Sequence, residues 1–170
     1  GNSEVLKLKD IKLSDPNSDE VQIKHVAIGL NYIDTYHRSG LYPVELPASI
    51  GIEGAGVIEK IGPDVKNFNL GDKVAYASMP IGAYSEKQIM PEEKLVLVPD
   101  GISDEVASCI TLKGITAEYL LHRAYPLKKG DKILYHAAAG ALGQILCPWA
   151  NALGAVVIGT VGSKAKEEIA

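Results

Sequence analysis

The residues best suited to chemistry form a turn of small side chains, Ala137 to Gly143, with the sequence AAAGALG. Small residues here allow a tight turn, close approach of the backbone to a pyrophosphate, and close packing of a helix on the preceding strand. The anion would lie at the helix N-terminus, where a side chain at Gly140 would occupy its place. The turn predicts a dinucleotide-binding site. Ala138 replaces the first glycine of the fingerprint, however, and close packing alone would use the same residues.

A second set of residues bears on which dinucleotide would bind. NAD sites usually carry an acidic residue at the end of the second strand, where it bonds the ribose 2′-hydroxyl. In this chain Gly162 is followed by Ser163, Lys164 and Lys166, and no carboxylate occurs before Glu167. An ammonium attracts a 2′-phosphate and a carboxylate repels it. These residues favour NADP(H) as the cofactor, the alternative being that the lysines are solvated residues opening a surface helix.

The elements that must position these residues are predicted from the apolar pattern. Apolar strands are expected at 131–136 and 155–160, with a helix over 140–153 between them, which makes one βαβ unit with parallel strands. Pro148 inside that helix predicts a kink or local widening over 144–148. One βαβ unit leaves an open parallel edge and the chain reaches 170 within a further helix, so we expect a longer polypeptide.

The first hundred residues have a different pattern. Partial alternation and β-branched residues predict strands at 5–13, 20–30, 54–61, 73–77, 83–90 and 94–98, separated by Gly, Pro and Asp turns. This spacing is typical of an antiparallel, barrel-like domain. A helix is expected from the N-cap Ser103 to about residue 123, broken near Gly114.

Composition excludes several classes of protein. The 170 residues carry 17 Lys and Arg against 21 Asp and Glu, and the net charge of −4 has the wrong sign for a nucleic-acid surface. Two cysteines without a CxxC pair indicate a reducing, cytoplasmic compartment. Residues 1–10 lack the apolar region of a signal peptide. The uncharged stretch 136–162 contains five glycines and Pro148, so we interpret it as buried strands and a phosphate turn rather than a membrane span.

Seven motifs occur in order along nearly the whole chain: NYIDTYHRSGLYP (31–43), GIEGAGVIEKIG (51–62), GDKVAY (71–76), GAYSE (82–86), LKGITAEYLL (112–121), HAAAGALG (136–143) and GTVG (159–162). Together they resemble the zinc-independent quinone oxidoreductases of the medium-chain dehydrogenase/reductase family. The resemblance implies an α/β plus β-rich protein: a GroES-like β-barrel catalytic domain over 1–101, followed by the first βαβ part of a Rossmann domain over 102–170.

The chain departs from the zinc-dependent alcohol dehydrogenases at their metal ligands. Asn31 stands in the stretch where those enzymes have a cysteine ligand, and Ile52 stands where their Gly-His-Glu stretch has a histidine. The lobe with four cysteines has no counterpart. Neither Asn nor Ile replaces Cys or His on zinc, so we expect no metal. His37 and His136 are interpreted as hydrogen-bonded structural groups.

The resemblance also implies roles for individual residues. The nicotinamide should lie between the two domains near Asn31, Tyr36 and Thr116, with Asn31 bonding the carboxamide or fixing the turn at a strand end. Tyr36 and Tyr42 would orient the quinone and stabilise the developing oxyanion, or pack at a domain edge. Asp34 would orient its neighbours or cap a helix. Further cofactor contacts are expected at Tyr32, Ile33, Tyr119, Gly140, Ala141, Leu142, Gly143, Gly162, Ser163 and Lys166.

The function implied is zinc-independent, NADPH-dependent reduction of quinones by hydride transfer. A quinone is electron-poor and gains aromaticity on accepting hydride, so positioning and hydrogen bonds suffice. The alternatives are an enone or activated-alkene reductase on the same scaffold and an NADPH-binding protein without catalysis. The family suggests a homodimer through the remainder of the Rossmann domain, and the 170 residues alone are expected to be inactive.

Overall fold

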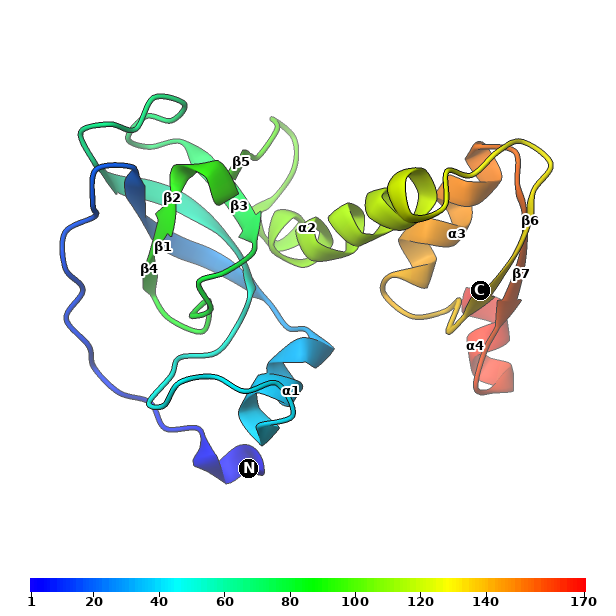
Figure 1. Cartoon of the computed structure of the whole chain (residues 1–170), viewed down its shortest axis with the longest axis horizontal. Coiled ribbons are helices and arrows are strands. Elements are labelled where there is room, and N and C mark those ends of the chain that lie inside the picture. Colours follow the sequence, from blue (N-terminus) through cyan, green and yellow to red (C-terminus); the bar gives the residue numbers. More distant parts are fainter. The chain divides into compact units, whose positions relative to one another are not determined.

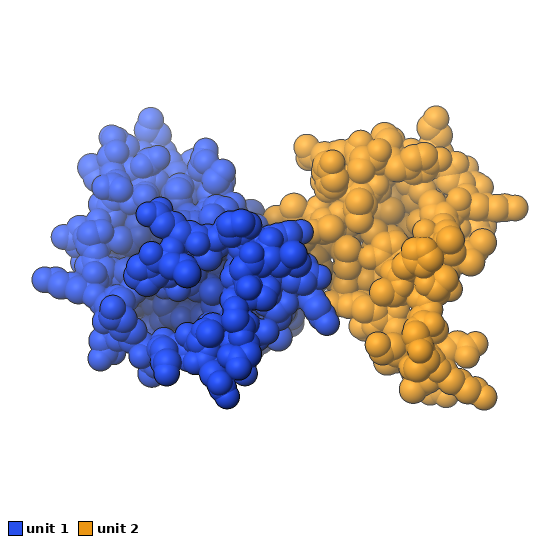
Figure 2. All heavy atoms as spheres, turned by 60° about the horizontal axis from the view of Figure 1, so that its bottom comes forward, with its two compact units in different colours: residues 1–111 blue, residues 112–170 orange.

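A computed structural model describes residues 1–170, which separate into two compact units, 1–111 and 112–170 (Figure 2). Helix α2 (Asp104–Glu118) runs across the division between them. The domain boundary expected at 101 therefore stays a prediction. None of the helices combines the length and the apolar composition needed to cross a membrane.

Unit 1 is built on a five-stranded antiparallel sheet (Figure 1). Its strands are β1 (Glu20–Gly29), β2 (Glu53–Ile61), β3 (Lys73–Ala77), β4 (Lys87–Pro91) and β5 (Val96–Leu97), in the order β4-β1-β2-β3-β5. Between β1 and β2 lies the helix α1 (Tyr32–Ser39), and the short 3-10 turns η1 (Ser3–Val5) and η2 (Glu92–Lys94) complete the unit. The antiparallel pairing agrees with the prediction.

The two faces of this sheet bury different side chains. One face carries the main core, which consists of Val21, Ile23, Ile58, Phe68, Val74, Tyr76, Ala83, Met90 and Leu95. The other face is lined by the small residues Ala55 and Ala75, against which Ala107 of α2 packs. Because side chains alternate between faces along a strand, large residues fill one side and small ones admit the helix on the other.

Helix α2 begins as expected but does not break. Ser103 caps it, since its Oγ accepts a hydrogen bond from the Val106 N–H at 3.3 Å. The predicted break near Gly114 is wrong: the α-helix continues to Glu118 and then widens into the π-helical turn η3 (Tyr119–Ala124). Glycine costs a helix about 1 kcal/mol relative to alanine, which the buried residues Ala107 and Ala117 on either side outweigh.

Unit 2 contains the expected βαβ arrangement. Strands β6 (Lys132–His136) and β7 (Val156–Thr160) pair in parallel, with the helix α3 (Gly143–Ala152) between them in sequence and α4 (Lys164–Ile169) after them. Leu146 and Ala150 of α3 form a buried cluster with Ala117 and Leu121. The predicted parallel pairing of the two strands is correct.

Several predicted boundaries are wrong. The strand at 5–13 does not form, because no other strand pairs with this segment; Val5, Leu8 and Ile11 are exposed. The strand expected at 83–90 begins only at Lys87. Helix α3 starts at Gly143 rather than 140, although the Gln144 N–H already donates to the Gly140 carbonyl at 2.9 Å.

The proline in α3 is tolerated without the predicted widening. The helix stays α-helical from Gly143 to Ala152 with Pro148 inside it. Pro148 and Gln144 both lie on the exposed side of the helix. The Gln144 carbonyl, which has no N–H of Pro148 to accept, can therefore be hydrated, and the helix need not open to satisfy it.

A polar chain crosses the core of unit 1. His25 Nδ1 lies 2.7 Å from the Ser85 carbonyl, and His25 Nε2 lies 2.7 Å from the Tyr76 hydroxyl. Tyr76 donates to Gln88 Oε1 at 2.7 Å, and Gln88 Nε2 donates to the Pro80 carbonyl at 2.8 Å. The chain joins β1, β3 and β4 through groups that would otherwise be buried without partners.

Acidification should destabilise this unit through His25. Burial lowers the pKa of the imidazole, outweighing the opposite effect of the Ser85 carbonyl. The unfolded chain then binds the proton more tightly than the folded one, so the free energy of unfolding should fall as the pH drops below about 6.5. Chemical denaturation at about pH 7.5 and about pH 5.5 should show a smaller fall in His25→Gln than in the wild type. The matched control is His122→Gln, which removes an exposed imidazole; equal falls in wild type and His25→Gln would contradict the assignment.

Two glycine substitutions should have opposite effects on stability. A Cβ at Gly143 would lie 2.3 Å from the Ala138 carbonyl oxygen, a backbone atom that has little freedom to move. Gly143→Ala should therefore lower the free energy of unfolding by about 1–3 kcal/mol. A Cβ at Gly114 meets nothing within 4 Å, so Gly114→Ala should raise it by about 1 kcal/mol. Denaturant titration measures both, and a neutral Gly143→Ala would refute the close contact.

Candidate cofactor and catalytic site

The small-residue turn connects β6 to α3 and is hydrogen-bonded to the end of β7. Ala137 has a positive φ of 59°, which turns the chain sharply after His136. The Ala138 N–H donates to the Thr160 carbonyl at 3.0 Å, and the Gly140 N–H donates to the Ala137 carbonyl at 2.8 Å. These bonds hold the turn against the carboxyl end of β7. The turn is thus a defined structure rather than an open loop.

Glycine is required where α3 leaves this turn. The Cβ that any other residue would place at Gly143 lies 2.3 Å from the Ala138 oxygen, and one at Gly159 would lie 2.7 Å from the Ala138 Cβ. Removing these side chains lets the first turn of α3 approach the strands closely. This is the packing expected of the third position of a dinucleotide fingerprint.

The N-terminus of α3 fits a pyrophosphate. The first N–H groups of a helix generally lack an intrahelical partner, and the dipole favours an anion there. In α3 the Gln144 and Ile145 N–H groups already donate to the Gly140 and Leu142 carbonyls. Gly140 and Ala141 are exposed and carry little or no side chain, so the backbone can be approached from solvent. Leu142 lies half-buried behind them. Of the predicted contact residues 140–143, Gly140 and Ala141 therefore lie on the surface, whereas Gly143 is buried.

The loop after β7 carries the predicted 2′-phosphate contacts. Gly162 has open space around it, and Ser163, Lys164 and Lys166 are all exposed. The Lys166 N–H donates to the Ser163 carbonyl at 3.1 Å, which starts α4. At the end of β6, His136 Nδ1 lies 2.9 Å from Thr160 Oγ1. His136 is thus hydrogen-bonded, as predicted.

In unit 1 the predicted residues gather around the start of α1. Asn31 is the N-cap, with extended backbone, and forms a capping box with Asp34. The Asn31 N–H donates to Asp34 Oδ2 at 2.9 Å. Asp34 is the third residue of the helix, so the alternative that Asp34 is the N-cap residue is wrong, although its carboxylate takes part in the capping box. Both side chains are at least nine-tenths buried.

A fully buried carboxylate holds the Asn31 amide. Asn31 Nδ2 donates to Glu53 Oε2 at 2.8 Å, and Glu53 has no exposed surface. Glu53 pairs with Gly29 across β1 and β2, and a Cβ at Gly29 would lie 2.4 Å from Glu53 Oε2. Gly29 therefore leaves the space that the carboxylate occupies. Sequence reasoning assigned no role to Glu53, although it lies in the quoted motif GIEGAG.

Tyr84 completes this cluster from another loop. Its hydroxyl donates to Asp34 Oδ2 at 2.9 Å. Its N–H donates to the Ile50 carbonyl at 3.0 Å, and its ring fills the space where a Cβ at Gly51 would lie. Burial and the Asp34 carboxylate both raise the pKa of the Tyr84 hydroxyl, which keeps it a neutral donor. This contact gives the motif GAYSE a structural role.

The tyrosines predicted to orient a substrate lie together. The Tyr36 and Tyr42 rings meet edge to face with centroids 5.4 Å apart, and Tyr32 meets Tyr36 at 6.0 Å. Tyr42 is 47% exposed and Tyr32 81% exposed, and Tyr36 is half-buried. His37 packs edge to face on Tyr42, but its buried Nδ1 has no hydrogen-bond partner. The predicted hydrogen bond of His37 is therefore missing at this atom.

The remaining predicted contacts are spread over both units. In unit 2, Thr116 Oγ1 donates to the Leu112 carbonyl at 2.7 Å, and Tyr119 lies 54% exposed at the start of the π turn. In unit 1, Ile33 is half-buried in α1. Throughout the chain, no three His, Cys, Asp or Glu side chains form a group that could hold a metal ion.

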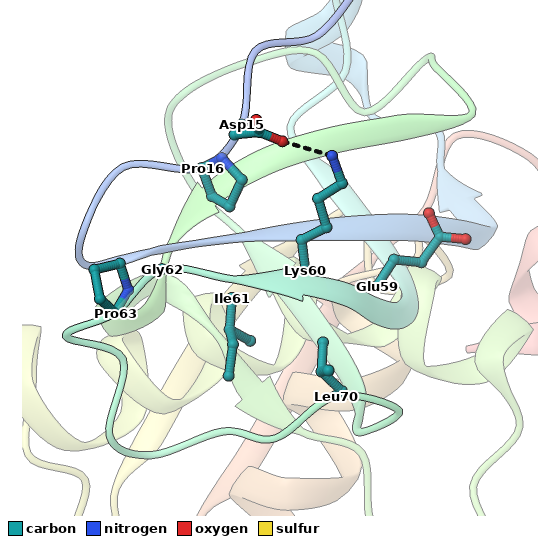
Figure 3. Close-up of a pocket in the computed structure, with 8 residues that line it drawn as sticks. All are labelled: Asp15, Pro16, Glu59, Lys60, Ile61, Gly62, Pro63 and Leu70. Atoms are coloured by element: carbon teal, nitrogen blue, oxygen red, sulfur yellow. Dashed lines mark hydrogen bonds and ion pairs between the residues drawn. The ribbon is translucent and has the colours of Figure 1, made fainter.

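A separate surface pocket of about 370 Å³ contains none of the predicted residues (Figure 3). It is lined by Asp15, Pro16, Glu59, Lys60, Ile61, Gly62, Pro63 and Leu70. Lys60 reaches across it to Asp15, with Nζ 2.6 Å from Oδ1. This pair lowers the pKa of the exposed Asp15 carboxyl, chiefly through the hydrogen bond. Exposed pairs of this kind stabilise little.

Known proteins match this chain along its whole length. The model of the alcohol dehydrogenase GroES-like domain matches residues 17–127. A quinone oxidoreductase from Pseudomonas aeruginosa is 52% identical over 171 residues, covering 100% of this chain and 53% of that protein. A 2-haloacrylate reductase from a Burkholderia species is 44% identical, covering 95% of this chain and 50% of that protein. The chain thus spans about half the length of the curated relatives it matches.

Solved structures agree with the observed fold. The crystal structure of Escherichia coli quinone oxidoreductase complexed with NADPH is 45% identical and superposes with a TM-score of 0.96, covering 99% of this chain and 52% of that one. The similarity confirms a GroES-like domain followed by the start of a Rossmann domain. Through its alcohol dehydrogenase GroES-like domain, this chain belongs to the medium-chain dehydrogenase/reductase family, alongside quinone oxidoreductases.

Proposed function

We propose that the protein containing this chain reduces quinones with NADPH and without zinc. The observation that carries the proposal is the turn at Gly140–Gly143, where only glycine allows α3 to approach the Ala138 carbonyl. The turn leaves the helix N-terminus open to a pyrophosphate. Support comes from similar proteins named quinone oxidoreductase, one of them crystallised with NADPH.

In this proposal the residues of unit 2 bind the cofactor. The backbone at Gly140, Ala141, Leu142 and Gly143 holds the pyrophosphate, while Ser163 and Lys166 hold the 2′-phosphate. The exposure of both side chains leaves them available for that contact. When bound, NADPH would supply the hydride. Thr116 and Tyr119 are proposed as further contacts of this unit.

Unit 1 would hold the nicotinamide end of the cofactor and position the quinone. Asn31 bonds the carboxamide of the nicotinamide, Tyr32 and Ile33 line its surroundings, and the hydroxyls of Tyr36 and Tyr42 donate to the quinone oxygens. Donors aimed at an oxygen that gains negative charge lower the barrier, because they are already oriented. Asn31 stands where related zinc enzymes have a cysteine ligand and is bonded instead to Glu53. Its amide nitrogen is no zinc ligand, which supports zinc-independent chemistry.

Reduction of an activated alkene is the second candidate function. The relative named 2-haloacrylate reductase, 44% identical, favours it. Such a substrate also develops negative charge on an oxygen conjugated to the reacting carbon, so the same two tyrosine hydroxyls would serve. The homodimer and the cytoplasmic location stay predictions.

The intact protein should oxidise NADPH faster than NADH in the presence of a quinone. The physical reason is the pair Ser163 and Lys166 with no carboxylate before Glu167. Loss of absorbance of the reduced cofactor measures the rate, with 2-haloacrylate and a simple enone as parallel acceptors. Faster turnover of an alkene would favour the second candidate, and NADPH binding without turnover of any acceptor would indicate a non-catalytic protein.

Removing the charge at Lys166 should weaken NADPH binding selectively. Lys166→Ala should raise the NADPH dissociation constant about tenfold, which corresponds to about 1.4 kcal/mol, and leave that of NADH nearly unchanged. Fluorescence titration measures both constants. The matched control is Lys132→Ala, because Lys132 is equally exposed but begins β6 at the end opposite the turn. Equal losses for NADPH and NADH would show that Lys166 does not contact the 2′-phosphate.

A further inference from the structure

We propose that Glu53 and Tyr84 are positioning residues that hold Asn31 in the orientation needed to bind the nicotinamide. The inference rests on the proposed function, because it assigns Asn31 to the nicotinamide end of NADPH. It adds two residues that the motifs contained but that had no role. The three segments that carry Asn31, Glu53 and Tyr84 are far apart in sequence and meet in unit 1.

Glu53 sets which way the Asn31 amide faces. A carboxylate only accepts hydrogen bonds, so the group 2.8 Å from Glu53 Oε2 must be the amide nitrogen. The amide oxygen then lies on the other edge of the same planar group. An amide next to an apolar residue would have no such preference, because its two orientations have nearly the same shape. The buried carboxylate therefore determines which edge of Asn31 presents a donor and which presents an acceptor.

Tyr84 holds the backbone that carries this amide. Asp34 Oδ2 accepts from both the Asn31 N–H and the Tyr84 hydroxyl, each at 2.9 Å. The Tyr84 N–H donates to the Ile50 carbonyl, and the Gly82 N–H donates to the Gly51 carbonyl at 2.8 Å. Ile50 and Gly51 lie just before the start of β2. The first turn of α1 is thus joined to the segment that leads into Glu53. The two sets of contacts that fix Asn31, one through Glu53 and the other through Asp34 and Tyr84, therefore both depend on the segment from Ile50 to Glu53.

A core that served stability alone would not need this arrangement. Buried polar groups and charges are costly, and apolar residues of similar volume often stabilise a fold as well or better. The cluster of Asn31, Asp34, Glu53 and Tyr84 instead gives one residue a single orientation. Asp34 Oδ1 is buried and has no partner, so the cluster keeps an unused acceptor.

Two ligands separate positioning from general damage to the fold. NADPH contains the nicotinamide, whereas 2′-phospho-ADP-ribose lacks it and tests only the phosphate and adenosine contacts. In Tyr84→Phe, which removes one hydroxyl, the dissociation constant for NADPH should rise about tenfold, the loss expected for a hydrogen bond to a charged group. The constant for 2′-phospho-ADP-ribose should stay within about twofold of the wild type. The kcat for quinone should fall with little change in the KM for quinone.

The matched control is Tyr76→Phe. Tyr76 is another tyrosine of unit 1 with a hydrogen-bonded hydroxyl, but it is fully buried and its partners are His25 and Gln88. Tyr76→Phe should lower the unfolding temperature without changing either dissociation constant. If Tyr84→Phe behaves like Tyr76→Phe, or weakens both ligands equally, Tyr84 is structural and the proposal is wrong.

Glu53→Gln provides a second variant with nearly the same shape. A glutamine amide can donate as well as accept, so the preference for one orientation of Asn31 is lost. The NADPH constant should again rise and the 2′-phospho-ADP-ribose constant stay unchanged; an unchanged NADPH constant would overturn the role of Glu53. Wild-type protein that binds NADPH but reduces no acceptor would contradict the proposed function. The comparison of the NADPH and 2′-phospho-ADP-ribose dissociation constants would still test whether Glu53 and Tyr84 position Asn31. Wild-type protein that binds no NADPH would contradict both.

Discussion

The buried carboxylate of Glu53 is the constraint on which the proposed site in unit 1 depends. A group with no exposed surface needs hydrogen-bond partners, and the Asn31 amide is one of them. That contact requires β1 and β2 to pair so that Glu53 faces Gly29, where a side chain would occupy the position of the carboxylate. A register shifted by one residue would turn Glu53 to the other face of the sheet. The geometry of the site therefore requires the observed register between β1 and β2.

Unit 2 also depends on a close approach, but here two backbone segments meet and no charged side chain is involved. Gly143 lies against the Ala138 carbonyl, and the turn between them is held to β7 by the bond to Thr160. A larger residue at 143 would push α3 away from the strands and move its N-terminus. In both units glycine marks the place where a functional group must come close to the main chain. Gly29 leaves room for the Glu53 side chain, and Gly143 lets α3 pack close to the strands.

Several errors in the predicted elements arise where the surroundings of a segment override its local residue types. The segment at 5–13 has residues suited to a strand, but a strand needs a partner for its backbone groups, and none pairs with it. Gly114 and Pro148 are unfavourable in helices, yet both helices continue through them. Local propensity is weaker than packing when neighbouring side chains are buried. Nothing in the residue types of Tyr119–Ala124 distinguishes this π turn from an α-helix.

The sequence by itself determined the family, the antiparallel and parallel halves and the turn of small residues between β6 and α3. Small residues, the alternation of apolar and polar residues, and motif order can be recognised in the sequence alone. It also identified Asn31, Tyr36 and Tyr42 as candidates, and the rings of Tyr36 and Tyr42 do lie in contact. Only the tertiary structure decided that Asn31, Asp34, Glu53 and Tyr84 form one hydrogen-bonded cluster. Such a cluster joins residues up to 53 positions apart through side-chain directions that follow from strand register and loop path, which no local pattern records.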